Sequence, residues 1–180
     1  RLDLGRLDRA AGSDYFAVAC GAGMDALVMT ATRSEEKHRW GMLAYVATTL
    51  RFISEIRSLD HVITVDGKEY EAHAAMVLVA NCGEVIPPYV RLRTGISPDD
   101  GLLDVVVMRA NSFGESVRAI WDLLREGHGG EAFVGYARGR EIRVETHPRT
   151  LVELDGDPGG ETPFTATCVP GAIRVMAPTG

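Results

Sequence analysis

Hydrophobic positions along this chain switch between helical and strand periodicity. From about Glu35 to Arg57, apolar side chains recur at three- and four-residue spacing, which predicts a long amphipathic helix. Shorter helices are expected over about 24–32 and about 113–126, the second with Gly127 placed to end it. The pattern therefore predicts about three helices.

Strand signals are more numerous and come in runs. The stretch "HVITVDGKEYEA" alternates on both sides of Asp66-Gly67, which is a two-residue hairpin signal. Further strands are expected in "AMVLVAN", "GLLDVVVMRA", "EIRVET", "TLVELDGD" and, after a bend over 168–171, "AIRVMAP". Because the strands do not alternate with helices, the pattern favours an α+β, mainly β domain built on antiparallel sheets.

Composition excludes several classes of function. The 180 residues, 46% of them hydrophobic, can bury a core, and the formal charge of -6 argues against nucleic acid as a partner. Cys20, Cys82 and Cys168 lie far apart, which suggests neither a disulfide framework nor a zinc site. No apolar run approaches the length of a bilayer span, and nothing resembles a signal peptide, so we expect a cytoplasmic protein. The opening at Arg1 reads as mid-protein sequence, so we also expect a fragment.

The stretch "GAGMDA" has the G-x-G-x-x-A spacing of a dinucleotide-binding turn. A Rossmann unit also needs a second parallel strand and an acid roughly 20 residues further on. No acid occurs between Glu36 and Glu55, and a second helix is expected there instead. We therefore interpret the motif as a strand-to-helix turn whose glycines relieve steric crowding.

Two acidic turns are the candidate sites. In "SPDDGLLD", Ser97 to Asp104, three acids surround one glycine, and such a turn can gather oxygen ligands for a hard cation. From spacing alone, a plain Asp-Gly turn is favoured. In "LVELDGDPGG", Asp155-Gly156 is a hairpin dipeptide, and its spacing alone favours a bend. The five histidines show no ligand spacing, and neither GxSxG nor HExxH occurs.

Six stretches, taken together and in this order, resemble a known family: "FAVACGAGMDA", "KHRWGMLAY", "VLVANCGE", "PDDGLLDVVVM", "VELDGDP" and "VPGAIRVMAP". They resemble the C-terminal half of the diacylglycerol kinase catalytic family, which includes bacterial lipid kinases and sphingosine and ceramide kinases. The resemblance covers nearly the whole chain. It implies a β-rich sandwich with a few helices, similar to the C-terminal domain of NAD kinases. The family's N-terminal domain carries a Gly-Gly-Asp-Gly-Thr nucleotide loop that this chain lacks, so residues 1–180 are expected to be the C-terminal domain and to be inactive alone.

The resemblance also implies roles for the two acidic turns. The "PDDGLLD" turn resembles a segment that holds a structural magnesium, with the Asp100 carboxylate and main-chain oxygens of Ser97 and Leu102 as ligands, and with Asp104 ordering the site through water. The "DGD" bend resembles an Asp-Gly-Glu motif. Asp157 then takes the place of the acid that accepts the proton of the lipid hydroxyl or contacts magnesium indirectly. Aspartate is one methylene shorter than the glutamate of the family.

The function implied is ATP-dependent phosphorylation of a hydroxyl on diacylglycerol or a related lipid. The implied cofactor is Mg²⁺, ATP would be bound mainly by the missing domain, and the implied partners are a lipid substrate, a transient membrane surface and a second copy of the chain. "EVIPPYVRLRTG" stands where the family often has a Gly-rich stretch after Asn81, so the acceptor pocket can differ. Two alternatives stay open. One is a NAD-kinase-like phosphotransferase, and the other is a non-catalytic lipid-binding or oligomerisation module of the same fold.

Overall fold

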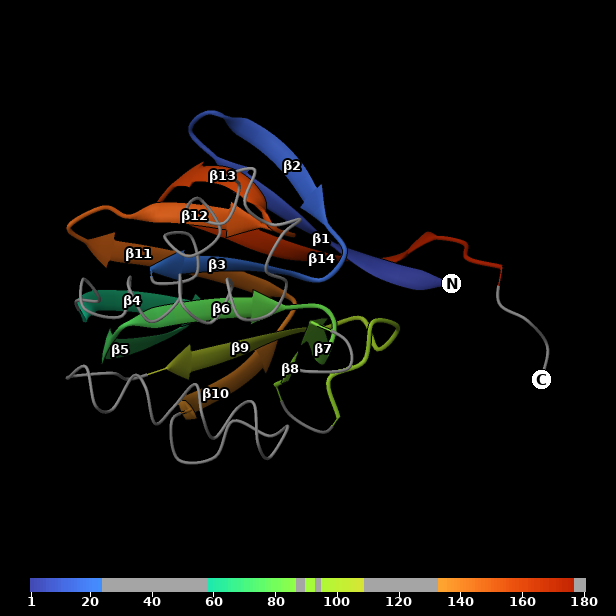
Figure 1. Ribbon diagram of the computed structural model, residues 1–180, viewed down its shortest axis with the longest axis horizontal. Helices are drawn as coiled ribbons and strands as arrows, with labels where there is room; N and C mark the ends of the chain where they lie inside the picture. Colours follow the sequence, from blue (N-terminus) through green and yellow to red (C-terminus); the bar gives the residue numbers. More distant parts are fainter. Residues whose placement is uncertain (24–57, 87–89, 93–94, 109–132, 177–180) are drawn as a thin grey trace, which may run out of the picture.

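The computed structural model describes residues 1–23, 58–86, 90–92, 95–108 and 133–176. Within these ranges every regular element is a β strand, and two six-stranded antiparallel sheets form a sandwich (Figure 1). The α+β prediction is therefore wrong for the described residues, which are all-β. Period-two alternation is clear over residues 59–65 and 141–147, where each strand turns one row of apolar side chains toward the facing sheet. The helices expected over 24–32, 35–57 and 113–126 lie outside the described residues.

Sheet A has the strand order β2-β1-β14-β11-β4-β5. Its strands are β1 (Leu2–Arg9), β2 (Gly12–Phe16), β4 (Leu59–Val65), β5 (Lys68–Ala74), β11 (Glu141–His147) and β14 (Phe164–Ile173). Strand β11 shows the rule clearly, because its residues alternate between exposed and buried along its whole length. The predicted hairpin at Asp66-Gly67 is confirmed between β4 and β5, with φ values of 47° and 83°.

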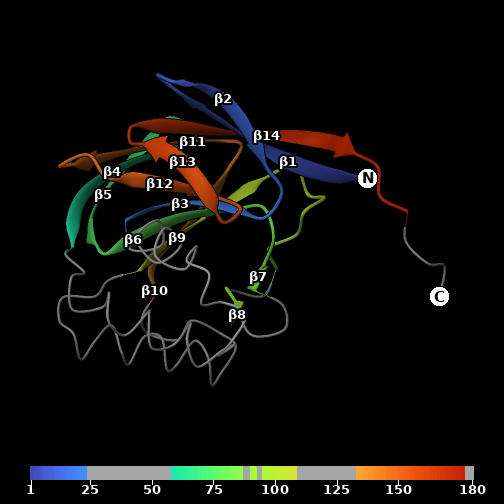
Figure 2. The same ribbon diagram turned by 45° about the horizontal axis from the view of Figure 1, so that its top comes forward.

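Sheet B has the order β10-β9-β6-β3-β12-β13 and packs against sheet A (Figure 2). Its strands are β3 (Ala19–Gly23), β6 (Met76–Ala80), β9 (Leu103–Met108), β10 (Phe133–Gly139), β12 (Leu151–Leu154) and β13 (Asp157–Glu161). A short pair, β7 (Glu84–Ile86) and β8 (Val90–Arg91), lies beside it. Strands β3, β6 and β9 are buried at every position, and Asp104 in β9 is their one charged residue.

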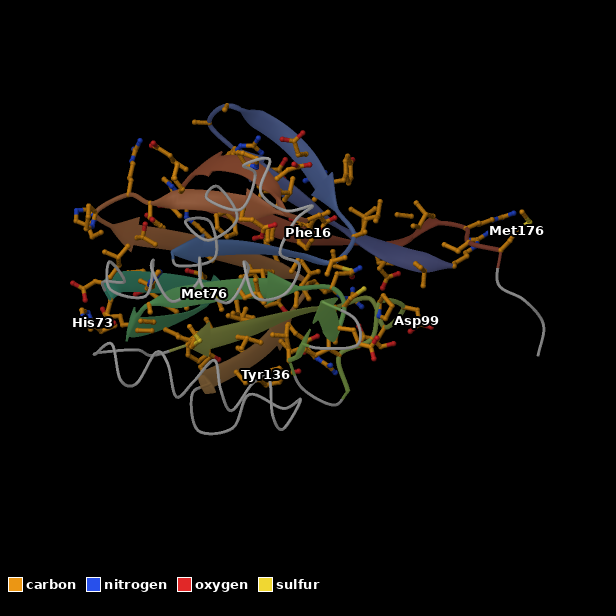
Figure 3. All side chains as sticks on the ribbon, in the orientation of Figure 1. Phe16, His73, Met76, Asp99, Tyr136 and Met176 are labelled. Atoms are coloured by element: carbon orange, nitrogen blue, oxygen red, sulfur yellow. The ribbon has the colours of Figure 1, made fainter. Side chains whose placement is uncertain are left out.

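The main core lies between the two sheets. Phe16, Phe164, Leu7, Leu103 and Ile142 are its largest apolar side chains, each no more than 1% exposed. Burying one such side chain contributes about 1.5–3 kcal/mol. Phe16 points into this core, whereas Met176, beyond the last strand, is 99% exposed (Figure 3).

Two features of the ends of the chain differ from the sequence predictions. Strands β1 and β2 were not predicted, although residues 2–9 alternate between buried and less buried positions. The last strand was predicted over 172–178, after a bend, but β14 covers Phe164–Ile173 and runs through that segment. The bend is replaced by an irregularity in the pairing with β1, where Leu2 pairs with Ile173 and Leu4 with Val169. A search of the described residues finds no helix that is long and apolar enough to span a membrane.

Candidate functional site

The two acidic turns lie at the same end of sheet B. The strand register pairs Asp104 with Ala80 and Ala80 with Ala19, while Leu154 pairs with Cys20. Strands β9, β6, β3 and β12 are successive neighbours, so at about 4.8 Å per strand the two turns are separated by roughly 14 Å. The turns are therefore close neighbours, but they are too far apart to share one ion.

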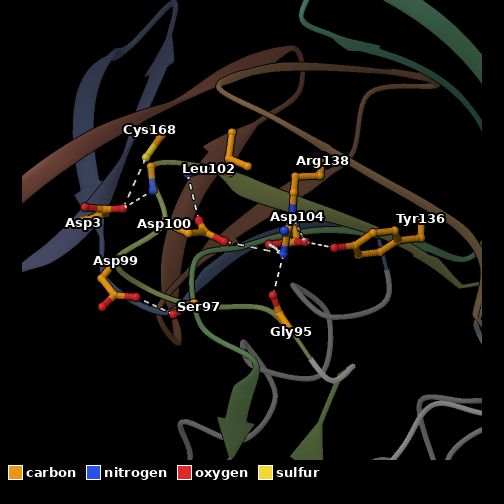
Figure 4. A network of polar contacts seen from close by, with 11 residues as sticks. Asp3, Gly95, Ser97, Asp99, Asp100, Leu102, Asp104, Tyr136, Arg138 and Cys168 are labelled. Atoms are coloured by element: carbon orange, nitrogen blue, oxygen red, sulfur yellow. Dashed lines mark hydrogen bonds and ion pairs between the residues drawn. The ribbon is translucent and has the colours of Figure 1, made fainter.

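Two of the three predicted ligand residues of the 97–104 turn, Asp100 and Leu102, are in direct contact (Figure 4). One oxygen of Asp100 accepts a hydrogen bond from the N–H of Leu102 at 3.0 Å, and the other lies 3.6 Å from the guanidinium of Arg138. The Ser97 hydroxyl donates to Asp99 rather than to Asp100. The turn keeps the carboxylate of Asp100 close to its own backbone.

Asp104 is fully buried behind this turn, and β10 supplies its partners. The hydroxyl of Tyr136 and the Nε of Arg138 both donate to it, the second at 3.0 Å. Burial, and then the hydrogen bond to Asp104, raises the pKa of Tyr136. The bond to Asp104 likewise raises the pKa of Arg138. Both side chains therefore keep the protons that they donate to the carboxylate.

Asp3 ties the turn to the first strand and was not among the predicted site residues. It is 4% exposed, and its carboxylate accepts the N–H groups of Gly101 at 2.7 Å and Gly171 at 2.6 Å. Its own N–H donates to the carbonyl of Pro98 at 2.7 Å. Burial first, and then the Asp3 carboxylate, raises the pKa of Cys168 to about 11. That thiol therefore stays protonated and is no nucleophile at neutral pH.

The two aspartates of the "DGD" bend differ in their contacts and exposure. The carboxylate of Asp155 accepts the N–H groups of Ala17, Val18 and Ala19 at 2.6, 2.9 and 2.9 Å. It thereby fixes the β12–β13 hairpin to the start of β3. Asp157 is the first residue of β13, is paired with Leu154 in the ladder, and is exposed. Asp155 thus has a structural role, while the bend presents Asp157 at the surface.

Asn81 connects the networks of the two turns. It is 1% exposed at the end of β6, and its Nδ2 donates to the carbonyls of Asp3 at 3.0 Å and Ala17 at 2.9 Å. Asp3 bonds the 97–104 turn, and Ala17 donates to Asp155. A continuous run of hydrogen bonds therefore joins the two candidate sites.

The oxygen atoms of the 97–104 turn are of the type that binds magnesium. Among the described residues there is no group of three His, Cys, Asp or Glu side chains placed to hold a metal. Magnesium, however, is often bound through one or two carboxylates together with several waters. The turn has three carboxylates, of which Asp104 is buried and Asp99 accepts a hydrogen bond from Ser97. The predicted ligand is the third, Asp100, together with main-chain oxygens. The guanidinium of Arg138 lies 3.6 Å from this carboxylate and would compete with the ion for it. This is the longest polar contact that Arg138 makes. The roles of Asp100, Ser97, Leu102 and Asp157 stay predictions.

Comparison with known sequences places the chain among lipid kinase relatives. A family described as "YegS C-terminal NAD kinase beta sandwich-like domain" matches residues 18–177. A protein of Staphylococcus haemolyticus named "Putative lipid kinase SH2167" is 26% identical over 163 residues. A protein of Staphylococcus aureus strain JH9 named "Putative lipid kinase SaurJH9_0749" is 24% identical over 165 residues. Each alignment covers 86% of this chain but only 51% of the relative, so the chain spans about half the length of these relatives.

Comparison with solved structures supports the same fold. A crystal structure of "a putative diacylglycerol kinase from Bacillus anthracis str. Sterne" superposes with a TM-score of 0.65 at 22% sequence identity. The match covers 94% of this chain and 54% of that one. A second structure of a putative diacylglycerol kinase from the same organism gives a TM-score of 0.64 at 23% identity. At this identity the likeness establishes the fold alone.

Proposed function

We propose that this chain, which belongs to the family of YegS C-terminal NAD kinase beta sandwich-like domains, is the acceptor-side domain of an ATP-dependent lipid kinase. The names of the relatives support kinase chemistry on a lipid. The alignments cover only 51% of those relatives, so we place most of the ATP contacts outside this chain. The acceptor would be a hydroxyl of diacylglycerol or a related lipid.

The observation that carries this proposal is that the two aspartates of the "DGD" bend lie in different environments. Asp155 is held by three backbone N–H groups, whereas Asp157 is exposed two residues later. We assign Asp157 as the general base. Its carboxylate takes the proton of the acceptor hydroxyl while the hydroxyl oxygen attacks the γ-phosphorus and the bond to the ADP oxygen breaks. A positioned base of this kind typically contributes about 10²–10⁴-fold in rate.

Magnesium has a supporting role in this proposal. The Asp100 carboxylate and main-chain oxygens of Ser97 and Leu102 would hold it, and it would supply positive charge that orders the turn. The chain's own residues do the remaining positioning. Asp3 fixes the backbone of the turn at Gly101, and Asn81 links it to the bend.

The acceptor pocket is not assigned to the cleft that opens between β5 and β10. That cleft has a volume of about 160 Å³ and is lined mainly by apolar residues, among them Ile63, Val105 and Val107. Sites for drug-sized ligands usually measure roughly 300–1,000 Å³. The cleft is therefore too small for a whole acyl chain.

Labelled ATP tests the proposal with the natural full-length protein. Transfer of the γ-phosphate is followed to diacylglycerol, sphingosine, ceramide and NAD in the presence of magnesium. We expect label on a lipid. Label on NAD would favour the NAD-kinase-like alternative, for which the family description is the supporting observation. Label on none of them would favour the non-catalytic lipid-binding or oligomerisation module.

A further inference from the structure

Arg138 joins three parts of the candidate cation turn. It lies on β10, and its guanidinium faces the turn (Figure 4). Nε donates to Asp104 at 3.0 Å, and one terminal nitrogen donates to the carbonyl of Gly95 at 2.5 Å. The same nitrogen lies 3.6 Å from Asp100. The guanidinium of Arg138 therefore contacts the start of β9, the loop before the turn and the candidate magnesium ligand, Asp100.

These contacts differ in how easily they can be given up. The side chain of Asp104 is 1% exposed, and a buried carboxylate needs a counter-charge. The side chain of Asp100 is 27% exposed and its contact with Arg138 is longer. A partly exposed ion pair at this distance contributes little net free energy. Breaking the contact between Arg138 and Asp100 therefore costs far less free energy than breaking the contact between Arg138 and Asp104.

A divalent cation and Arg138 compete for the same oxygen ligand. One Asp100 oxygen already accepts the Leu102 N–H, and Arg138 faces the other. A metal ion on Asp100 would place two further positive charges within a few ångströms of the guanidinium. Like charges at such a distance repel, most strongly where water is partly excluded.

We propose that Arg138 is a positioning residue whose contact with Asp100 is broken when a divalent cation binds the Asp100 carboxylate. Without the cation, Arg138 holds Asp100 and the Gly95 carbonyl against the start of β9. With the cation bound, it releases Asp100 and keeps Asp104. The inference rests on the assignment of magnesium to Asp100 in the proposed function. Its consequence is that Arg138 lowers the affinity of the turn for the cation.

Manganese binding to the natural full-length protein tests this, with free Mn²⁺ measured by electron paramagnetic resonance and Mg²⁺ added as a competitor. Arg138→Gln should bind Mn²⁺ about threefold to tenfold more tightly than the wild type, because one nearby positive charge is gone. Asp100→Asn should lose the same site. Arg143→Gln is the matched control, because Arg143 pairs with Glu145 at 2.8 Å on the surface of β11, and it should change nothing. Equal or weaker binding by Arg138→Gln would overturn the inference.

A second measurement needs only the wild type as its sample and decides the question if Arg138→Gln does not fold. The Nε–H signals of the arginines are followed by ¹⁵N NMR during a Mg²⁺ titration. The signal of Arg138 should shift to saturation, and that of Arg143 should stay in place. An unchanged Arg138 signal, or no cation binding, overturns the inference while leaving lipid phosphorylation to its own assay. A shifted Arg138 signal without lipid labelling would instead contradict the proposed function only.

Discussion

The carboxylate of Asp155 accepts the N–H of Val18 at 2.9 Å across 137 positions of the chain. It also accepts the neighbouring N–H groups of Ala17 and Ala19. Asp155 therefore joins the β12–β13 hairpin to the strand that follows β2. Together with the pairing of β12 and β3, this side chain fixes the hairpin and the exposed residue that it carries, Asp157.

Removing this carboxylate should destabilise the fold. We expect Asp155→Ala to lower the free energy of unfolding by about 2–3 kcal/mol, because three backbone donors lose a charged acceptor. Asp157→Ala, two residues away and exposed, should cost about 1 kcal/mol or less. Urea unfolding of both variants checks this. Equal losses would show that the hairpin does not depend on Asp155.

Gly23 should tolerate no side chain. Its φ is +107°, and an added Cβ would lie 2.3 Å from the carbonyl oxygen of Ala75. We expect Gly23→Ala to cost at least about 3 kcal/mol, from backbone strain and the clash together. Gly67→Ala is the control, because φ there is +83° but nothing lies within 4 Å of the added Cβ. It should cost only the strain, about 1–2 kcal/mol. Thermal or urea unfolding measures the difference, and similar costs would argue against the clash.

His61 should make stability depend on pH. The side chain is 1% exposed, with Nε2 3.1 Å from the carbonyl of Ala74, and burial lowers its pKa. As the pH falls below about 6.5, the unfolded chain binds a proton at His61 that the folded chain does not yet bind. The stability is therefore fully present above that pH and is lost as the pH falls toward the lowered pKa of the folded state.

Urea unfolding at pH 7.5, 6.5 and 5.5 measures this loss. The slope should reach at most about 1.4 kcal/mol per pH unit. His61→Gln keeps an N–H donor but does not titrate, so the slope should shrink in that variant. If the slope were the same with and without His61, another group would be responsible.

Local signals explain which parts of the fold could be predicted from sequence. The bends at Asp66-Gly67 and Asp155-Gly156 depend on adjacent residues, and all four adopt the positive φ that such turns require. Strands β6 and β9 could be predicted because continuous apolar runs mark strands that are buried on both faces. The signal at the start of the chain is weaker in β2, because most of that strand is exposed and carries no apolar row.

The candidate site was only partly predictable, because its side chains meet through long-range pairing. Asp100 and Asp157 belong to recognisable turns. Arg138, however, reaches Asp104 only because β10 pairs with β9, and Asp3 reaches Gly101 across 98 positions. No spacing rule along the chain connects such residues. The alternation of β1 could have suggested a strand, but not that Asp3 would face the turn.

The most direct test of the account is the initial rate of lipid phosphorylation by the natural full-length protein carrying Asp157→Asn, compared with wild type and Asp157→Glu. The rate is measured with saturating ATP and magnesium, after unfolding curves show that all three proteins are folded. We predict a loss of about 10²-fold or more for Asp157→Asn, because the substituted amide cannot accept the proton, and substantial activity for Asp157→Glu. An Asp157→Asn rate equal to the wild-type rate would contradict the assignment of Asp157 as the base presented by the "DGD" bend.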